Sequence, residues 1–258
     1  MNLAVPSLLL LLLAQESPKP TEAAAAEAAF VCPPCGAECH FRTYPKAGNC
    51  GNCGMTLVPL ASVPQIGVLL HPQAGLMTTT LTLSVFAGAD VARAFTVADT
   101  AQALRLGDTL ELKPQFTFAD SPALDVLVVP DGFGAWDDEL VVEWVKKQAE
   151  HARFVLAVDT GSVVLARAGL LASGERVPAS KFLAQRGKEL ASDVVFDAGT
   201  SWRRSGRLFL ARDAGGAVDA ALAIVAELGG VERARRTAER MGHAWTPAPA
   251  DAGEPQKQ

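Results

Sequence analysis

The sequence predicts an α/β protein with a doubly wound, mostly parallel sheet, preceded by a small zinc-ribbon-like module. From Gln65 onward, short β-branched runs alternate with longer amphipathic stretches, a pattern typical of parallel sheets covered by helices. All five cysteines of the 258-residue chain lie between Cys32 and Cys53. The apolar content of 49% is enough for one large core beside that module.

The chain opens with an apolar run that predicts a signal peptide over residues 1–14. Leu3 to Ala14 are almost all apolar, and a dozen residues is too short for a bilayer, which needs about 20. Residues 15–29 are rich in Pro, Ala and Glu and read as a linker. We therefore expect an exported protein, periplasmic or extracellular. The alternative is an apolar N-terminus with no targeting role.

Residues 30–60 form a cysteine-rich segment that is too short to bury a core of its own. It contains two C-x2-C pairs, and two such pairs supply the four thiolates of a tetrahedral metal site. Soft sulfur ligands suit Zn²⁺ or another soft metal ion. Two disulfides with one leftover thiol are the alternative, as is exchangeable metal in a heavy-metal sensor or chaperone. The predicted ligands are Cys32, Cys35, Cys50 and Cys53, with Cys39 and His40 in reserve.

The segment from Phe30 to Pro59 resembles the heavy-metal-binding domain attached to bacterial metal-efflux and periplasmic proteins. The run CGNCGMTLVP, which begins at Cys50, carries most of this resemblance. That family often has Met-His where this chain has Pro34-Cys35, so the site expected here is all-thiolate.

The large domain is predicted over residues 65–246 as alternating strands and helices. The expected strands are Ile66–Leu70, Ala94–Ala98, Val126–Val129, Phe154–Val158 and Arg207–Ala211, with a hairpin of Thr109–Leu112 and Phe116–Phe118. The expected helices are Thr78–Ala89, Asp138–Glu150, Ser162–Ala168, Ala179–Leu190, Ala217–Leu228 and Val231–Met241. Trp202 to Arg204 are expected in a loop, and Trp136 and Trp144 in the core.

The charge of the chain argues against a nucleic acid partner. The formal net charge is −5, the pI is near 5.4, and basic residues occur only as short pairs. No nucleic acid partner is expected for such a chain. Residues 247–258 are polar and Pro-rich and are predicted to be disordered.

Three segments in order resemble the ThiJ/PfpI family of the class I glutamine amidotransferase-like superfamily. They are IGVLLHP from Ile66, SPALDVLVVPDG from Ser121 and AVDTGS from Ala157. The resemblance covers the whole of residues 65–246 and implies the flavodoxin-like sheet. It also implies a homodimer, because members of the family commonly dimerise.

The resemblance places Asp159 where the family carries its cysteine nucleophile, in a strained strand-to-helix turn. The family's acidic partner falls at Thr78 and its histidine near Ser180, so the whole Cys/His/acid set is replaced. This implies a non-catalytic protein that acts by ligand binding or assembly. The replacements at Asp159 and Thr78 are consistent with each other. In the family the acidic partner tunes the cysteine thiol, but beside an aspartate at the same position it would only add charge repulsion.

Asp159 itself leaves two interpretations open. It lies next to a predicted helix N-terminus, where Asp is a favoured cap. Alternatively it is a nucleophile of a hydrolase or lyase, paired with His71, which ends the first strand at the edge where ligands bind in such sheets. The ligand is an unknown small molecule, and the acidic residues favour a cation or a polar neutral compound. The remaining predicted pocket residues are Asp131, Gly132, Thr160 and Thr78.

Overall fold

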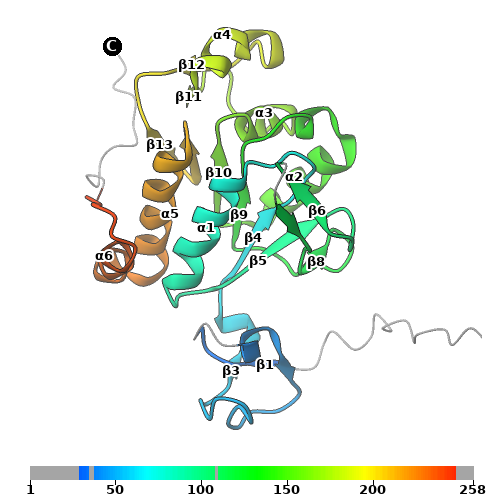
Figure 1. The fold of residues 1–258 in the computed structure, drawn as a ribbon, viewed down its shortest axis with the longest axis vertical. Helices are drawn as coiled ribbons and strands as arrows, with labels where there is room; N and C mark the ends of the chain where they lie inside the picture. The colour runs from blue at the N-terminus through cyan, green and yellow to red at the C-terminus, as the bar shows by residue number, and fades with distance from the viewer. Residues whose placement is uncertain (1–28, 35–37, 108–109, 248–258) are drawn as a thin grey trace, which may run out of the picture.

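A computed structural model describes residues 29–34, 38–107 and 110–247 of the chain. The largest unit is a seven-stranded sheet with helices on both faces, and a small cysteine module lies below it in Figure 1. The order of the sheet is β13-β14-β10-β9-β4-β5-β8. Its strands are β4 (Gln65–Leu69), β5 (Arg93–Ala98), β8 (Phe116–Thr117), β9 (Val126–Val129), β10 (Phe154–Val158), β13 (Trp202–Ser205) and β14 (Leu208–Ala211).

The sheet is parallel except at one edge. Strands β4, β5, β8, β9, β10 and β14 pair in parallel, and only β13 runs antiparallel. Every residue of β4, β9, β10 and β14 is buried, because helices cover both faces and leave no polar side to these strands. The predicted doubly wound, mostly parallel sheet is therefore confirmed.

Two separate apolar layers hold the helices to the sheet. On one face lie α1 (Leu76–Gly88) and α5 (Ala214–Gly229), with α6 (Val231–Arg240) packed against α5. On the other lie α2 (Glu139–His151) and α3 (Gly161–Arg167), and Trp136 and Trp144 are buried in that layer as expected. All six predicted helices are present, with ends shifted by up to three residues.

The predicted hairpin is wrong in its pairing. Strand β7 (Leu110–Leu112) pairs with β6 (Leu104–Leu106), whereas β8 leaves the hairpin and joins the sheet beside β5. Contacts between distant residues explain the difference. The Gln115 side chain accepts a hydrogen bond from Thr96 N at 2.9 Å, and the Phe116 ring lies 4.7 Å from the Phe95 ring.

The expected loop at Trp202 to Arg204 is also wrong, because these residues form the edge strand β13. The Trp202 ring stacks on Phe209 of β14, with 6.2 Å between the ring centroids. A second unpredicted feature stands beside it at the top of Figure 1. It is the parallel pair β11 (Arg176–Pro178) and β12 (Val195–Asp197), joined through α4 (Lys181–Leu190).

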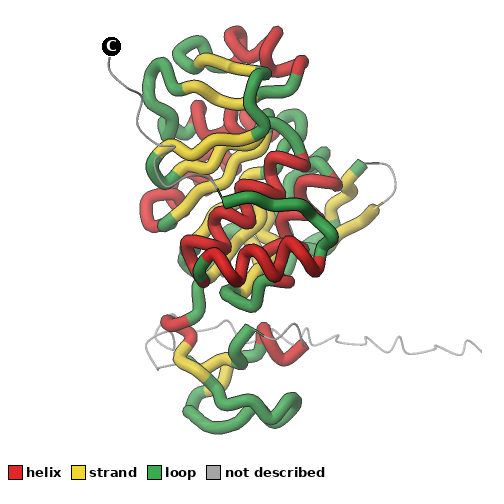
Figure 2. The backbone as a smooth tube through the Cα atoms, turned by 90° about the vertical axis from the view of Figure 1, so that its left-hand side faces the viewer, coloured by secondary structure: helices red, strands yellow, loops and turns green. Residues whose placement is uncertain are grey.

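The cysteine module consists of three two-residue strands, β1 (Phe30–Val31), β2 (Thr43–Tyr44) and β3 (Val58–Pro59). The short 3₁₀ helix η2 (Glu38–Phe41) precedes β2, and η3 (Leu60–Ser62) leads directly into β4. The module therefore lies at the amino-terminal edge of the large sheet, below the α/β body in Figures 1 and 2.

One buried side chain joins the module to the sheet. Arg93, the first residue of β5, is only 3% exposed, and its guanidinium lies 5.5 Å from the centre of the Phe41 ring. It also donates to the carbonyl of Phe41 and to Gln65 Oε1 of β4. The module is thus fixed to the first residues of two central strands.

The predicted signal peptide, most of the linker and the tail beyond residue 247 fall outside the described residues. Within the described part of the chain, no helix combines the length and apolarity that crossing a bilayer requires.

Candidate functional site

Asp159 lies in a tight turn between β10 and α3. Its φ of 45° is in the left-handed region, which residues other than Gly, Asn and Asp seldom adopt. The Asp159 amide donates to Ala211 O at 2.7 Å, and its carbonyl accepts from Ser162 N at 2.9 Å. A Cβ on Gly161 would lie 2.4 Å from Val129 O, so the turn has no room for a side chain there. The predicted strand-to-helix turn is confirmed.

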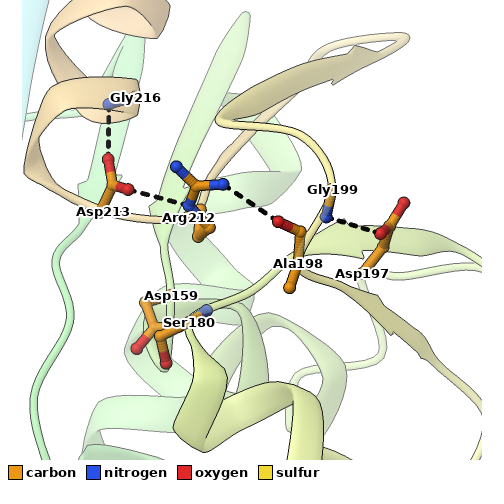
Figure 3. Close-up of polar contacts among 8 residues, drawn as sticks. All are labelled: Asp159, Ser180, Asp197, Ala198, Gly199, Arg212, Asp213 and Gly216. Atoms are coloured by element: carbon orange, nitrogen blue, oxygen red, sulfur yellow. Dashed lines mark hydrogen bonds and ion pairs between the residues drawn. The ribbon is translucent and has the colours of Figure 1, made fainter.

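The Asp159 carboxylate does not cap α3, in contrast to the capping interpretation. The N-cap of α3 is Thr160, without a side-chain hydrogen bond to the helix. Instead Asp159 Oδ1 accepts from Ser180 N at 2.8 Å, so the position predicted for the family's histidine does lie against Asp159. Figure 3 shows the two residues side by side. Burial raises the pKa of Asp159, the Ser180 bonds oppose that shift, and the charge of Asp131 adds to it.

The other predicted pocket residues gather next to this turn in two contacting pairs. The Thr78 hydroxyl of α1 donates to the Asp131 carboxylate, which places the family's acidic position beside a carboxylate from the loop after β9. The Thr160 hydroxyl accepts from Gly132 N at 2.8 Å and donates to Gly132 O at 3.0 Å. The loop after β9 is therefore fastened to the turn after β10.

His71 is close to this group but does not contact Asp159. Its Nδ1 lies 2.8 Å from Pro72 O, and in the described part of the chain no hydrogen bond or ion pair joins it to Asp159. Its side chain is almost fully buried, which lowers the pKa of His71 from its usual 6.5 and keeps the ring neutral at pH 7. The predicted acid/base pair of His71 and Asp159 is therefore absent as a direct contact.

The sequence analysis missed an ion pair at the end of β14. Arg212 Nε donates to Asp213 Oδ2 at 2.9 Å, and its Nη1 donates to Ala198 O at 3.0 Å. Asp213 also caps α5 through Gly216 N at 2.9 Å. Figure 3 shows the Arg212 guanidinium directed toward Asp213 and Ala198, while the Asp159 carboxyl group points the other way. The only sequence signal was that Arg212 follows directly after a buried strand.

The cysteine module brings together four sulfur atoms, all within 4.8 Å of one another. They belong to Cys32, Cys39, Cys50 and Cys53, and none of these four is in a disulfide. The Cys32 and Cys53 sulfurs are 3.1 Å apart, and those of Cys32 and Cys39 are 3.8 Å apart. Zn–S bonds of about 2.3 Å place the sulfurs of a tetrahedral site about 3.8 Å apart, so the cluster could hold a metal ion.

Three of the four predicted ligands are in this cluster, and Cys39, held in reserve, is the fourth member. Cys35 lies outside the described residues, as does the side chain of His40, so their roles stay predictions. Cys39 comes from η2, which ends at Phe41 under Arg93. C-x2-C spacing alone gave no sign that this turn would carry a sulfur into the cluster.

A tyrosine adds a polar contact to the cluster. The Tyr44 hydroxyl lies 3.3 Å from the Cys50 sulfur. This hydrogen bond lowers the pKa of Cys50 to about 6 and raises the pKa of Tyr44 to about 12. The thiolate is the form that binds metal, so the hydroxyl favours the ligand state of Cys50.

Comparisons with known proteins match the large domain. The family model of the DJ-1/PfpI family matches residues 65–227. An isonitrile hydratase of Pseudomonas putida is 34% identical over 194 residues, which are 74% of this chain and 83% of that protein.

Solved structures with less than 25% identity share the fold. A ThiJ/PfpI family protein from Pseudomonas syringae superposes with a TM-score of 0.63 at 23% identity, over 73% of this chain and 77% of that one. Drosophila melanogaster DJ-1beta superposes with a TM-score of 0.61, also at 23% identity, over 70% of this chain and 99% of that one.

Proposed function

Because this chain belongs to the DJ-1/PfpI family, we propose that its α/β domain binds a small molecule at the carboxyl edge of the sheet without thiol chemistry. The single observation that carries the proposal is the state of Asp159. It occupies the strained turn where the resemblance expects a cysteine, and its carboxylate is bonded to the backbone of Ser180. No cysteine occurs after Cys53 in the sequence to take over the role.

The surroundings of Asp159 support binding rather than nucleophilic catalysis. An ester on Asp159 would need a base to activate water for its hydrolysis. His71, the base that the sequence suggested, is hydrogen-bonded to Pro72 O and not to Asp159. The Thr78 hydroxyl donates to Asp131. Neither group is hydrogen-bonded to Asp159 as a base that serves this residue would be.

We assign a structural role to a metal in the cysteine module and propose Zn²⁺. Four thiolates close a tetrahedral site and leave no open position for a substrate. The residues that would hold the ion are Cys32, Cys39, Cys50 and Cys53. When bound, the metal would supply cross-links that a module of this size cannot obtain from a core.

Export and dimerisation are further parts of the proposal, supported by the apolar N-terminal run and by the family resemblance. N-terminal sequencing of the mature protein and analytical ultracentrifugation test them. An uncleaved N-terminus in the cell extract would contradict export. A monomer at all concentrations would contradict dimerisation.

The test of the function uses the reaction named for the Pseudomonas putida relative. An aryl isonitrile is incubated with the wild-type protein and with Asp159→Asn and Asp159→Cys, and formamide formation is followed. We expect no turnover above buffer for the wild type or for Asp159→Asn. Turnover by the wild type that disappears in Asp159→Asn would instead establish an enzyme with aspartate chemistry.

The metal assignment is tested by elemental analysis of the purified protein and of single Cys→Ser variants. We expect one metal ion per chain and its loss in Cys39→Ser. Full retention of metal in Cys39→Ser, with loss in Cys35→Ser, would restore the ligand set predicted from the two C-x2-C pairs. Rapid transfer of the ion to a chelator without any structural change would favour a metal sensor or chaperone.

A further inference from the structure

Two exposed phenylalanines form an unusual surface feature of the α/β domain. Phe133 is 54% exposed and Phe182 is 42% exposed, and their ring centroids are 5.4 Å apart at an angle of 75°. Trp136 meets Phe133 edge-on from the other side, with centroids 6.0 Å apart, but is itself buried. Edge-to-face packing leaves ring faces open, and aromatic rings bury large areas when a partner covers them.

These rings belong to the same corner of the fold as Asp159. Phe133 directly follows Gly132, whose amide and carbonyl are bonded to the Thr160 hydroxyl. Phe182 is two residues after Ser180, whose amide is bonded to the Asp159 carboxylate. Asp159 and Thr160 are neighbours in the chain, so hydrogen bonds, ring contact and covalent bonds close a loop around this corner.

The charges closest to the Asp159 carboxylate are acidic, and the exposed Lys181 stands between Ser180 and Phe182 in the chain. The Asp159 carboxylate is half-buried, and Asp131 is near enough to influence it electrostatically. Arg212, the cation drawn with Asp159 in Figure 3, is paired with Asp213.

A buried polar atom beside the corner also lacks a partner. Nε2 of His71 has no hydrogen-bond partner in the described part of the chain, and the residue is 2% exposed. The neighbouring ring atom Cε1 would lie 2.5 Å from a Cβ on Gly132. An unsatisfied buried nitrogen beside the Gly132 loop is a feature that a polar ligand group would relieve.

We propose that this corner binds an organic ammonium ion, with the ammonium group on the Asp159 carboxylate and the apolar part against Phe133 and Phe182. The inference rests on the proposed ligand-binding function and names the class of ligand. Aromatic faces attract cations, and this attraction grows when the site is partly desolvated. A carboxylate with a second acidic group nearby disfavours anionic ligands by repulsion.

The experiment uses three probes that share a phenylethyl group and carry a cationic, a neutral or an anionic head group: 2-phenylethylammonium, 2-phenylethanol and 3-phenylpropionate. Binding to the full-length protein is measured by isothermal titration calorimetry, with tryptophan emission as a second readout because Trp136 contacts Phe133. We expect the ammonium probe to bind at least about tenfold more tightly than the alcohol, and the carboxylate probe to bind weakest.

Variants separate the two halves of the site. Asp159→Asn should remove the preference for the cation while leaving the affinity for the alcohol within about twofold. Phe133→Ala and Phe182→Ala should weaken both the cation and the alcohol. Leu140→Ala is the matched control, since Leu140 is a 68% exposed apolar residue of α2 with no part in the loop of contacts.

The outcomes distinguish this inference from the function on which it rests. Equal affinity for the cation and the alcohol, unchanged by Asp159→Asn, overturns the ammonium site but leaves a ligand-binding edge. No saturable binding of the ammonium probe up to about 10 mM also overturns it. Isonitrile turnover that depends on Asp159 would instead overturn the proposed function itself.

Discussion

Asp159 combines two features that are costly for a single residue. Its backbone has a φ of 45°, and its carboxylate is partly removed from water, with hydrogen bonds from Ser180 and from the Thr160 amide as compensation. Three hydrogen bonds hold Asp159 in the turn after β10. Its amide donates to Ala211 O, its carbonyl accepts from Ser162 N, and its carboxylate accepts from Ser180 N. Such local strain is concentrated at functional sites, which agrees with a ligand site at this corner.

The raised pKa of Asp159 predicts a pH-dependent effect of Asp159→Asn. In acid, below about pH 4, the carboxyl is protonated in both folded and unfolded chains, so it carries no burial cost there. As the pH rises through the folded pKa, the wild type pays for burying an anion, whereas Asn does not. We therefore expect the variant to become more stable than the wild type as the pH rises toward neutral, with a higher Tm; partial solvation of the carboxylate keeps the effect small.

Thermal denaturation of both proteins across this pH range checks the prediction. The gap between the two Tm values should open as the pH rises from about 4 to about 7. A gap of constant size would show that the difference in stability does not arise from the charge of Asp159.

Gly132→Ala tests how tightly the loop after β9 is held. The φ of Gly132 is +145°, and a Cβ there would lie 2.5 Å from both Gln73 O and His71 Cε1. We expect a loss of about 1–3 kcal/mol in the free energy of unfolding, measured by denaturant titration. Gly88→Ala is the control, because its Cβ meets nothing within 4 Å at the end of α1 and should be neutral or slightly stabilising. Equal effects of the two changes would contradict the close approach seen at Gly132.

At the scale of elements, the buried strands were predictable and the edge strands were not. Strands β9 and β10 are continuous apolar runs, and β4 has no polar side chain after Gln65, because both faces of these strands are covered. The edge strand β13 reads as polar, since Trp202 to Ser205 are only partly buried. Its pairing depends on the neighbouring strand β14, which local sequence cannot reveal.

The helix α4 is the element that links the small β11–β12 pair to Asp159. The Ser180 hydroxyl caps it by accepting from Leu183 N at 3.2 Å, while the Ser180 amide donates to Asp159. Ser180→Ala should cost about 1 kcal/mol through the lost cap. Ser180→Pro should cost more, because proline removes the amide as well, although the native φ of −61° suits proline.

Chemical denaturation of the two Ser180 variants measures both steps. The difference between them gives the contribution of the bond to Asp159. That difference should shrink in the Asp159→Leu background, where no carboxylate remains to accept the bond. A difference that persists there would assign the cost of proline to α4 alone.

At the scale of the molecule, the metal module and the Asp159 corner lie at opposite edges of the sheet. Arg93, the first residue of β5, contacts the module, whereas Asp159 follows the last residue of β10. Five residues of strand separate the two edges by about 16 Å. A metal held by the cysteine cluster would therefore take no direct part in events at Asp159, and a stabilising role would suit its position.

Metal removal should unfold the module and leave the α/β domain folded. The chain offers separate probes, because Tyr44 is its single tyrosine and all four tryptophans lie between Trp136 and Trp245. A chelator should shift the ultraviolet absorbance of Tyr44, whose hydroxyl contacts Cys50, without changing tryptophan emission. In the Arg93→Ala variant, too, a chelator should leave tryptophan emission unchanged. Loss of tryptophan signal on metal removal would show instead that the sheet depends on the module.

The sequence by itself determined the architecture and the place of the chemistry. Runs of apolar residues define the central strands, the confinement of all cysteines to Cys32–Cys53 defines the metal module, and the turn at Asp159 is set by local chain chemistry. Each of these features depends on residues close together in the sequence, so the sequence alone predicts it.

Only the tertiary structure decided which groups meet. The bond from Ser180 to Asp159 joins residues 21 apart, the Thr78 hydroxyl meets a carboxylate 53 residues away, and Cys39 reaches the other sulfurs from a turn outside the C-x2-C pairs. Such contacts arise when packed helices and strands bring distant segments to one place. Residues close together in the sequence decide the secondary structure of each segment, but not which distant segments pack against it. The chemistry of the Asp159 corner depends on that packing.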